Sequence, residues 1–218
     1  MIDGDFFIRR LRALDPKRAS TPHIMARTVR AIAHVHARHA NRELYRIFFY
    51  DCEPIKDRVH NPITGRCINF SKSELYTFRT ALHNELRASR KTALRLGMLR
   101  RDPDNPWIIK PEKGMELLRR TLNIENLDSE KDIILNVRQK EVDMKIGIDI
   151  ATLSLKRQVD TIVLVAGDCD FVPAAKLARR EGIDFILDAM RRPIDTRLHE
   201  HIDGLRTVIK QHPITPPK

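Results

Sequence analysis

The sequence lacks a long apolar segment and has few cysteines. No run of about 18 consecutive apolar residues occurs in the 218-residue chain, which argues against a transmembrane helix. The first ten residues, MIDGDFFIRR, carry acids where a secretory signal carries positive charge, and they lack a small-residue cleavage site. Cys52, Cys67 and Cys169 are an odd number without a CxxC spacing, which argues against a disulfide framework or a zinc cage. We therefore expect a cytoplasmic protein without a membrane segment.

Acidic residues are also scarce relative to basic ones. The chain has 29 Asp and Glu against 40 Lys and Arg, a net charge of +11. Such an excess favours polyanionic partners through electrostatic steering and counterion release, although a solvated basic surface has the same composition. Residues 87–120 hold ten bases and four acids, over half of the excess. We predict that nucleic acid binds there, to Arg87, Arg90, Lys91, Arg95, Arg100 and Arg101.

The first half of the chain predicts helices, a strand and an insert. Thr21 and Pro22 form an N-cap and first helical residue, and residues 45–50 form an aromatic, β-rich strand ending before Asp51. Ser71 and Glu74 have the spacing of a capping box. Residues 92–99 and 107–109 flank the turn-like segment 102–106 and predict a β-hairpin.

The second half predicts an alternating α/β pattern. The apolar run 162–166 is typical of a strand buried on both faces of a parallel sheet. A helix over 143–157 precedes this strand, and a helix over 171–180 and a strand over 183–187 follow it. A last helix is expected near 195–210. We predict one domain over residues 1–212 with a basic insert at about 55–125, and a loose tail over 213–218.

Acidic residues follow the predicted strands. Asp3 follows a very short apolar segment, and Asp168 and Asp170 follow the strand predicted from the apolar run 162–166. Ligands bind beyond the carboxyl ends of parallel strands, so these carboxylates converge if their strands are neighbours. Carboxylates that converge without Cys or His favour Mg²⁺ or Mn²⁺ over zinc.

Other acids near this edge have competing interpretations. Asp143 and Asp149 belong to the helix that precedes that apolar strand, and Gly147 between them is expected to allow close backbone packing. Six residues is an awkward helical interval, and Asp143 could instead cap its helix. Asp170 could be the N-cap of the next helix, and alternation is expected to point Cys169 away from its Asp neighbours. Taken singly, each carboxylate has a structural interpretation. Together they predict a metal site.

Four segments resemble a known family. They are residues 2–6 (IDGDF), 48–54 (FFYDCEP), 140–153 (KEVDMKIGIDIATL) and 161–187 (TIVLVAGDCDFVPAAKLARREGIDFIL). In this order they resemble the NYN domain of the PIN-like nuclease group, in particular its LabA-like branch. One feature departs from that pattern, because only Met1 and Ile2 precede Asp3 and the first strand is therefore expected to be very short.

The resemblance implies a three-layer, Rossmann-like α/β fold with a central, mainly parallel sheet. It implies a metal-dependent endoribonuclease that hydrolyses RNA, with a single strand as the expected substrate, and it leaves a homodimer open. Carried over by motif, the catalytic acids are Asp3, Asp143, Asp149, Asp168 and Asp170. The Mg²⁺ or Mn²⁺ ligands among them are Asp3, Asp143, Asp168 and Asp170.

Two alternatives to a ribonuclease remain at this stage. The first is a non-catalytic RNA-binding or regulatory module with the same fold, which the short first strand favours. The second is a phosphatase similar to the haloacid dehalogenases, because Asp3-Gly4-Asp5 matches their DxD motif. The usual Thr or Val two residues after the second Asp is replaced by Phe7, which argues against it.

Overall fold

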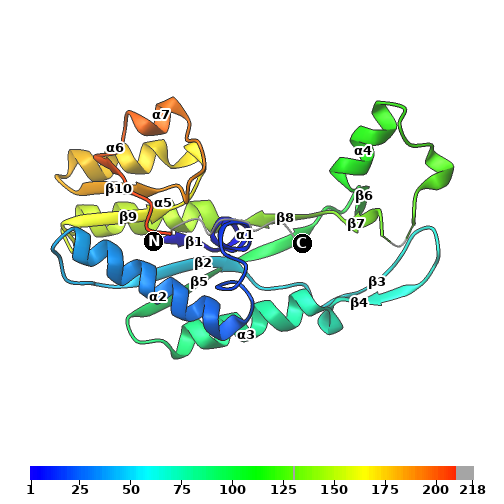
Figure 1. The fold of residues 1–218 in the computed structure, drawn as a ribbon, viewed down its shortest axis with the longest axis horizontal. Coiled ribbons are helices and arrows are strands. Elements are labelled where there is room, and N and C mark those ends of the chain that lie inside the picture. The colour runs from blue at the N-terminus through cyan, green and yellow to red at the C-terminus, as the bar shows by residue number, and fades with distance from the viewer. Residues whose placement is uncertain (130, 210–218) are drawn as a thin grey trace, which may run out of the picture.

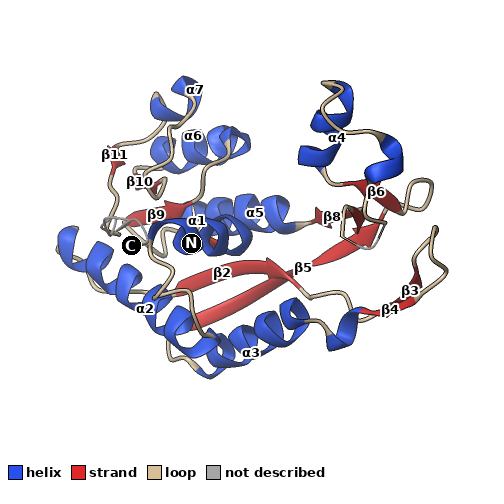
Figure 2. Ribbon diagram, turned by 45° about the vertical axis from the view of Figure 1, so that its right-hand side comes forward, coloured by secondary structure: helices blue, strands red, loops and turns tan. Residues whose placement is uncertain are grey.

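The computed structural model describes residues 1–129 and 131–209, and it confirms the α/β fold (Figures 1 and 2). Seven strands form one sheet in the order β11-β10-β9-β1-β2-β5-β8. The pairs within this sheet are parallel except for β5 with β8, which is antiparallel. The strands are β1 (Ile2–Asp3), β2 (Ile47–Cys52), β5 (Thr92–Arg101), β8 (Val137–Lys140), β9 (Thr161–Val165), β10 (Asp184–Asp188) and β11 (Gly204–Leu205).

Helices cover both faces of the sheet and create two cores. One core joins the first three helices to one face, and the other joins the fifth and sixth helices to the opposite face. The fold therefore has three layers. The helices are α1 (Gly4–Leu14), α2 (Pro22–His39), α3 (Glu74–Ala88), α4 (Pro111–Leu118), α5 (Val142–Leu155), α6 (Val172–Arg180) and α7 (Thr196–His199), with 3-10 helices η1 (Phe70–Lys72), η2 (Ile124–Asn126) and η3 (Cys169–Phe171).

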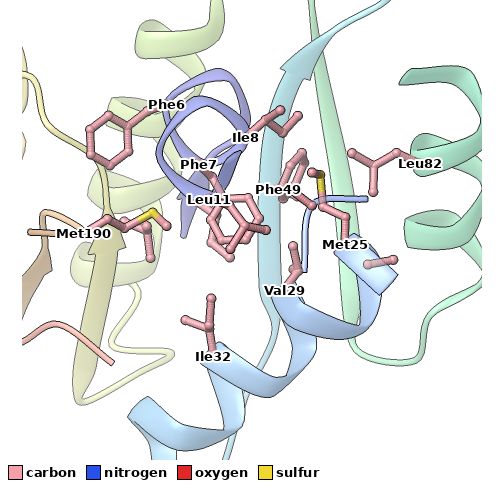
Figure 3. Packing of buried hydrophobic residues seen from close by; sticks show 14 of the residues in the cluster. Phe6, Phe7, Ile8, Leu11, Met25, Val29, Ile32, Phe49, Leu82 and Met190 are labelled. Carbon is pink, nitrogen blue, oxygen red and sulfur yellow. The ribbon is translucent and has the colours of Figure 1, made fainter. Parts of the chain in front are cut away.

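The first core holds the N-terminal helix against the middle of the sheet (Figure 3). Phe7 of α1 meets Phe49 of β2 edge to face, with ring centroids 6.2 Å apart. Met25 and Val29 of α2 are fully buried in the same cluster. Burying such side chains stabilises a fold by roughly 1.5–3 kcal/mol each, so α1 is firmly held although β1 is only two residues long.

The short first strand agrees with the sequence prediction and lies at the centre of the sheet. Ile2 is in register with Phe49 of β2 on one side and with Val165 of β9 on the other. Asp3 therefore ends a central strand, and α1 begins at the next residue.

The predicted hairpin is wrong. Residues 92–99 belong to β5, which continues to Arg101 and pairs with β2 and then with β8. Residues 107–109 form β6 (Trp107–Ile109), which pairs with β7 (Ile133–Leu135). Turn residues mark a break at 102–106, but β5 and β6 pair with β8 and β7, whose residues lie at least 24 positions further along the chain.

Residues 102–129 and 131–136, here called the arm, project from the sheet beyond the end of β5 (Figures 1 and 2). The arm contains β6, α4, η2 and β7. A second projection, the antiparallel ribbon of β3 (Arg58–His60) and β4 (Cys67–Asn69), precedes η1 and α3. Both projections follow the carboxyl end of a sheet strand, β5 and β2 respectively.

Three local predictions also require correction. Ser73, not Ser71, caps α3, because its hydroxyl accepts from the Tyr76 N–H while the Ser71 hydroxyl donates to Asn69. The expected last helix is reduced to α7, and the chain then adds β11 to the sheet edge. The backbone at Gly147 has no close neighbour, since a Cβ built there meets nothing within 4 Å. The predicted tail at 213–218 lies outside the described residues.

No helix in the described part of the chain is long and apolar enough to cross a membrane.

Candidate metal centre

Acids from three parts of the chain meet at the carboxyl edge of the sheet. Asp3 ends β1, and Asp168 lies three residues beyond the end of its neighbour β9. Asp143 lies in the first turn of α5, which begins at this edge. The electrostatic influence of Asp143 on Asp3, and of Asp168 and Asp170 on Asp143, links the four carboxylates into one acid cluster.

Asp3 is both a helix cap and a member of the acid cluster. Its Oδ1 accepts a hydrogen bond from the Phe6 N–H at 3.2 Å, which caps α1. Burial raises the pKa of Asp3 to about 6, and the charges of Asp5 and Asp143 act in the same direction, against the Phe6 hydrogen bond and Arg9. The ionised form of Asp3 is therefore disfavoured until a positive charge approaches it.

Asp143 is exposed to solvent and lies where the chain enters α5. Two residues earlier, Glu141 has a left-handed backbone with φ of 73°, which turns the chain from β8 into the helix. Partial burial and then the charges of Asp168 and Asp170 raise the pKa of Asp143. Like-charge repulsion thus extends across the whole acid cluster.

The loop after β9 supplies two exposed carboxylates and a thiol. Ligand atoms of Asp168, Cys169 and Asp170 lie within 4.8 Å of one another. The expectation that Cys169 points away from its neighbours is therefore wrong, and its Sγ also accepts from Arg197 Nη2 at 3.4 Å. Asp170 is not a helix cap: Asp168 caps η3 by accepting from the Asp170 N–H at 3.1 Å.

Asp149 does not join the acid cluster. It is buried in α5, where Arg95 Nε donates to Oδ2 at 2.9 Å and Arg95 Nη2 donates to Oδ1 at 2.6 Å. The Tyr50 hydroxyl donates to Oδ2 at 2.9 Å. With both oxygens engaged, Asp149 connects α5 to β5 and β2, and Arg95 is held by the same contact.

A second charged network, beside the acid cluster, was missed by the sequence prediction. Arg79 Nη1 of α3 donates to both oxygens of the buried Asp51, at 2.6 and 2.7 Å, and its Nη2 donates to Asp5 at 2.8 Å. His83 Nε2 lies 2.8 Å from Asp51 Oδ2. Burial opposes ionisation of Asp51, but the contacts with His83 and Arg79 hold its pKa below the usual range.

The signal for this network was present in the sequence. Asp51 is flanked by Tyr50 and Cys52 within an apolar strand, and a charge in such a position requires a partner. Arg79 and His83 are four residues apart and so lie on one face of α3. The network also occupies Asp5, whose other oxygen lies 3.0 Å from Arg9, so Asp5 is less available to a cation than Asp3.

The six predicted nucleic-acid-binding residues do not form one surface. Arg87, Arg90 and Lys91 precede β5, at the amino edge of the sheet, opposite the acid cluster. Lys91 there bonds to Glu43 and the Leu44 carbonyl. Arg95 is paired with Asp149, whereas Arg100 and Arg101 lie exposed at the carboxyl end of β5.

The donor set of the acid cluster fits a hard divalent cation. Asp3, Asp143, Asp168 and Asp170 offer carboxylate oxygens, the ligand type that Mg²⁺ and Mn²⁺ prefer. Contrary to the sequence prediction, one sulfur atom lies among them, Cys169 Sγ, which accepts from Arg197 Nη2. The pKa values of Asp3 and Asp143 are raised first by burial and then by neighbouring carboxylates, and a cation beside these groups would favour their ionised forms. Asp3 and Asp143 lie outside the 4.8 Å group of the β9 loop, so the cluster is wider than that group alone.

The fold and this edge define an α/β protein with an acidic centre beyond its parallel strands. The family model of the NYN domain matches residues 117–198, which is less than half of the chain. That stretch contains Asp143, Asp168 and Asp170 but not Asp3. No curated protein and no solved structure matches the chain. The match supports a relationship with the NYN family and a fold of the nuclease type.

Proposed function

We propose that the protein is a metal-dependent endoribonuclease that hydrolyses single-stranded RNA at the acid cluster. The observation that carries this proposal is the meeting of Asp3, Asp143, Asp168 and Asp170 at the carboxyl edge of the sheet. These residues would hold Mg²⁺ or Mn²⁺. When bound, the cation supplies charge neutralisation for a phosphodiester and a lowered pKa for a water molecule.

The residues of the chain have distinct tasks in this proposal. Asp168 and Asp170 are exposed and would present their carboxylates to cation and substrate. Asp3 is fixed by its capping hydrogen bond and would hold the cation at the end of β1. Arg79 neutralises Asp5 and Asp51, so that the excess negative charge remains on the acid cluster.

Cleavage of a labelled single-stranded RNA by purified protein tests the proposal. We expect cleavage with Mn²⁺ and with Mg²⁺, none with EDTA, and a loss of at least about a hundredfold in Asp168→Asn/Asp170→Asn, a magnitude in line with losing the charge stabilisation of a transition state. The matched control is Asp160→Asn/Asp184→Asn, which removes two exposed acids at the amino edge of the sheet and should keep full activity.

Two results would contradict the proposal. Cleavage that persists unchanged in Asp168→Asn/Asp170→Asn would mean that a contaminant or another site is responsible. RNA binding without cleavage under any metal condition would instead select the non-catalytic RNA-binding module.

A further inference from the structure

The pairing of β5 with β8 places positive charges opposite one another. Arg100 is the direct partner of Arg138, and Met98 is the direct partner of Lys140. Side chains opposite each other in an antiparallel pair have Cβ atoms about 4.5–5.5 Å apart, and like charges at that spacing are destabilising. An anion held between these side chains would remove the repulsion.

These residues share the face of the sheet that points away from α5. On the α5 face, Arg95 reaches Asp149, and a Cβ on Gly97 would meet Val142 at 2.9 Å. Because side chains alternate along a strand, Met98 and Arg100 point to the opposite face, together with their cross-strand partners. We call Arg100, Arg138 and Lys140 the basic ladder.

The basic ladder is exposed, and one of its members pairs with an acid. All three residues are exposed to solvent. Arg138 Nη2 lies 3.4 Å from Asp102 Oδ2, and the Arg138 side chain in this pair keeps 66% of its surface exposed. Within residues 1–129 and 131–209, neither Arg100 nor Lys140 forms an ion pair. The Asp102 side chain keeps only 18% of its surface exposed, but the pair is open to solvent on the Arg138 side, so a phosphate can compete with the carboxylate there.

The position of the basic ladder relates it to the acid cluster. Asp3 of β1 is in register with Tyr50 of β2, and Tyr50 is in register with Arg95 of β5. Arg100 lies five residues further along β5, which is about 17 Å at the rise of an extended strand. The two intervening strand spacings add about 10 Å sideways. Tyr50 and Arg95 face α5 whereas the basic ladder faces away from it, so an RNA strand that reaches both sites must pass around the carboxyl edge of the sheet.

We propose that the basic ladder binds the phosphates of single-stranded RNA and carries the strand between the acid cluster and the arm. The inference rests on the proposed function for the substrate class. It adds Arg138 and Lys140, which lie outside the basic stretch 87–120, to the residues predicted to bind RNA. It excludes Arg87, Arg90 and Lys91, which lie at the other edge of the sheet.

The test compares two variants with the same loss of charge. Arg138→Gln/Lys140→Gln removes two cations of the basic ladder. Lys156→Gln/Arg157→Gln removes one lysine and one arginine, both exposed, where α5 ends at the amino edge. Binding of a fluorescently labelled single-stranded RNA is followed by anisotropy in EDTA over a range of salt concentrations, beside thermal unfolding of each protein.

We expect the ladder variant to bind about tenfold more weakly and the control to bind as the unmodified protein does. The slope of log affinity against log salt should fall by about 1.4 for the two lost phosphate contacts, since each contributes about 0.7 on a single strand. Arg100→Gln should lower the affinity in the same direction without lowering the unfolding temperature, because it relieves the repulsion from Arg138.

Equal weakening of both variants would show that net charge alone matters and would overturn the inference, as would unchanged binding in the ladder variant. Because the assay contains EDTA, it does not depend on catalysis. Failure of the proposed ribonuclease activity, judged by Asp168→Asn/Asp170→Asn, is therefore distinguishable from failure of the basic ladder.

Discussion

At the scale of single residues, Asp3 couples proton binding to metal binding. Its pKa is raised to about 6 by burial, with Asp5 and Asp143 adding to the effect. The folded chain thus holds this proton more tightly than the unfolded chain does. In the metal-free protein, the resulting stability is fully present below pH 3.8 and is lost as the pH rises through about 6.

The affinity for a metal ion should rise with pH, whereas the stability contributed by the Asp3 proton falls. A cation at the acid cluster must displace the Asp3 proton, so Mn²⁺ should bind about tenfold more weakly at pH 5 than at pH 7, with the change centred near pH 6. Calorimetric titration of Mn²⁺ at several pH values measures this. Asp3→Asn should bind more weakly and with a flatter pH profile; an affinity independent of pH in the unmodified protein would exclude Asp3 as a ligand.

The sequence indicates which acids follow strands but not which charges are paired in the interior. Asp3, Asp168 and Asp170 can be placed at strand ends because those ends are visible in the apolar pattern, and their role as metal ligands stays a prediction. Asp149 is also an aspartate, but Arg95 and Tyr50 donate hydrogen bonds to its two oxygens. That pairing depends on the register of β2 with β5 and on the packing of α5, which no local pattern encodes.

At the scale of secondary-structure elements, the contact between α1 and β2 positions the acid cluster. Gly4 begins α1 directly after Asp3, and a Cβ at this position would meet the Tyr50 carbonyl oxygen at 2.5 Å and a Phe49 ring carbon at 2.6 Å. Only glycine therefore allows the helix to start this close to β2, and a larger residue would displace Asp3 with it.

A pair of glycine variants tests this positioning. Gly4→Ala should destabilise the fold by about 3 kcal/mol, the upper part of the range for overpacking, because the clash is with backbone. Gly147→Ala in the middle of α5 has open space around it and should stabilise the fold by about 0.5–1 kcal/mol. Chemical denaturation of both variants measures the difference, and a Gly4→Ala protein as stable as the unmodified one would contradict the close approach.

Elements with strong local signals were predicted well, and elements defined by distant partners were not. The start of α2 at Thr21 and Pro22 and the strand β9 followed from capping and apolar patterns. The hairpin prediction failed because β5 and β6 pair with β8 and β7, far along the chain. Turn residues mark where a strand ends, but they do not specify the strand that it pairs with.

At the scale of the whole molecule, the two edges of the sheet hold different features. The carboxyl edge holds the acid cluster, the basic ladder and both projections. At the amino edge, a cavity of about 450 Å³ is lined by apolar side chains such as Ile32, Phe48 and Ile162 and by charged residues such as Arg42, Glu43 and Asp160. The proposed RNA path therefore uses one edge, which is why a matched control for every binding variant can be drawn from the other.

The antiparallel pairing that ends β5 also makes the arm separable. Arg101 and Val137 are direct partners, so the chain leaves the sheet and returns to it at adjacent points. Direct partners in an antiparallel pair have Cα atoms about 4.5–5.5 Å apart, a gap that a two-residue turn closes. In topological terms, the arm is the long loop of a hairpin, and loops of this kind generally tolerate insertion and deletion.

A protein in which Asn-Gly replaces residues 102–136 should accordingly fold and keep the body of the sheet. We expect a circular dichroism spectrum that retains the α/β character and one cooperative thermal transition. Loss of folding would show instead that the arm stabilises the body. In this respect the arm is a module inserted between two paired strands of the sheet, and a protein engineer could try another module between the same two strands.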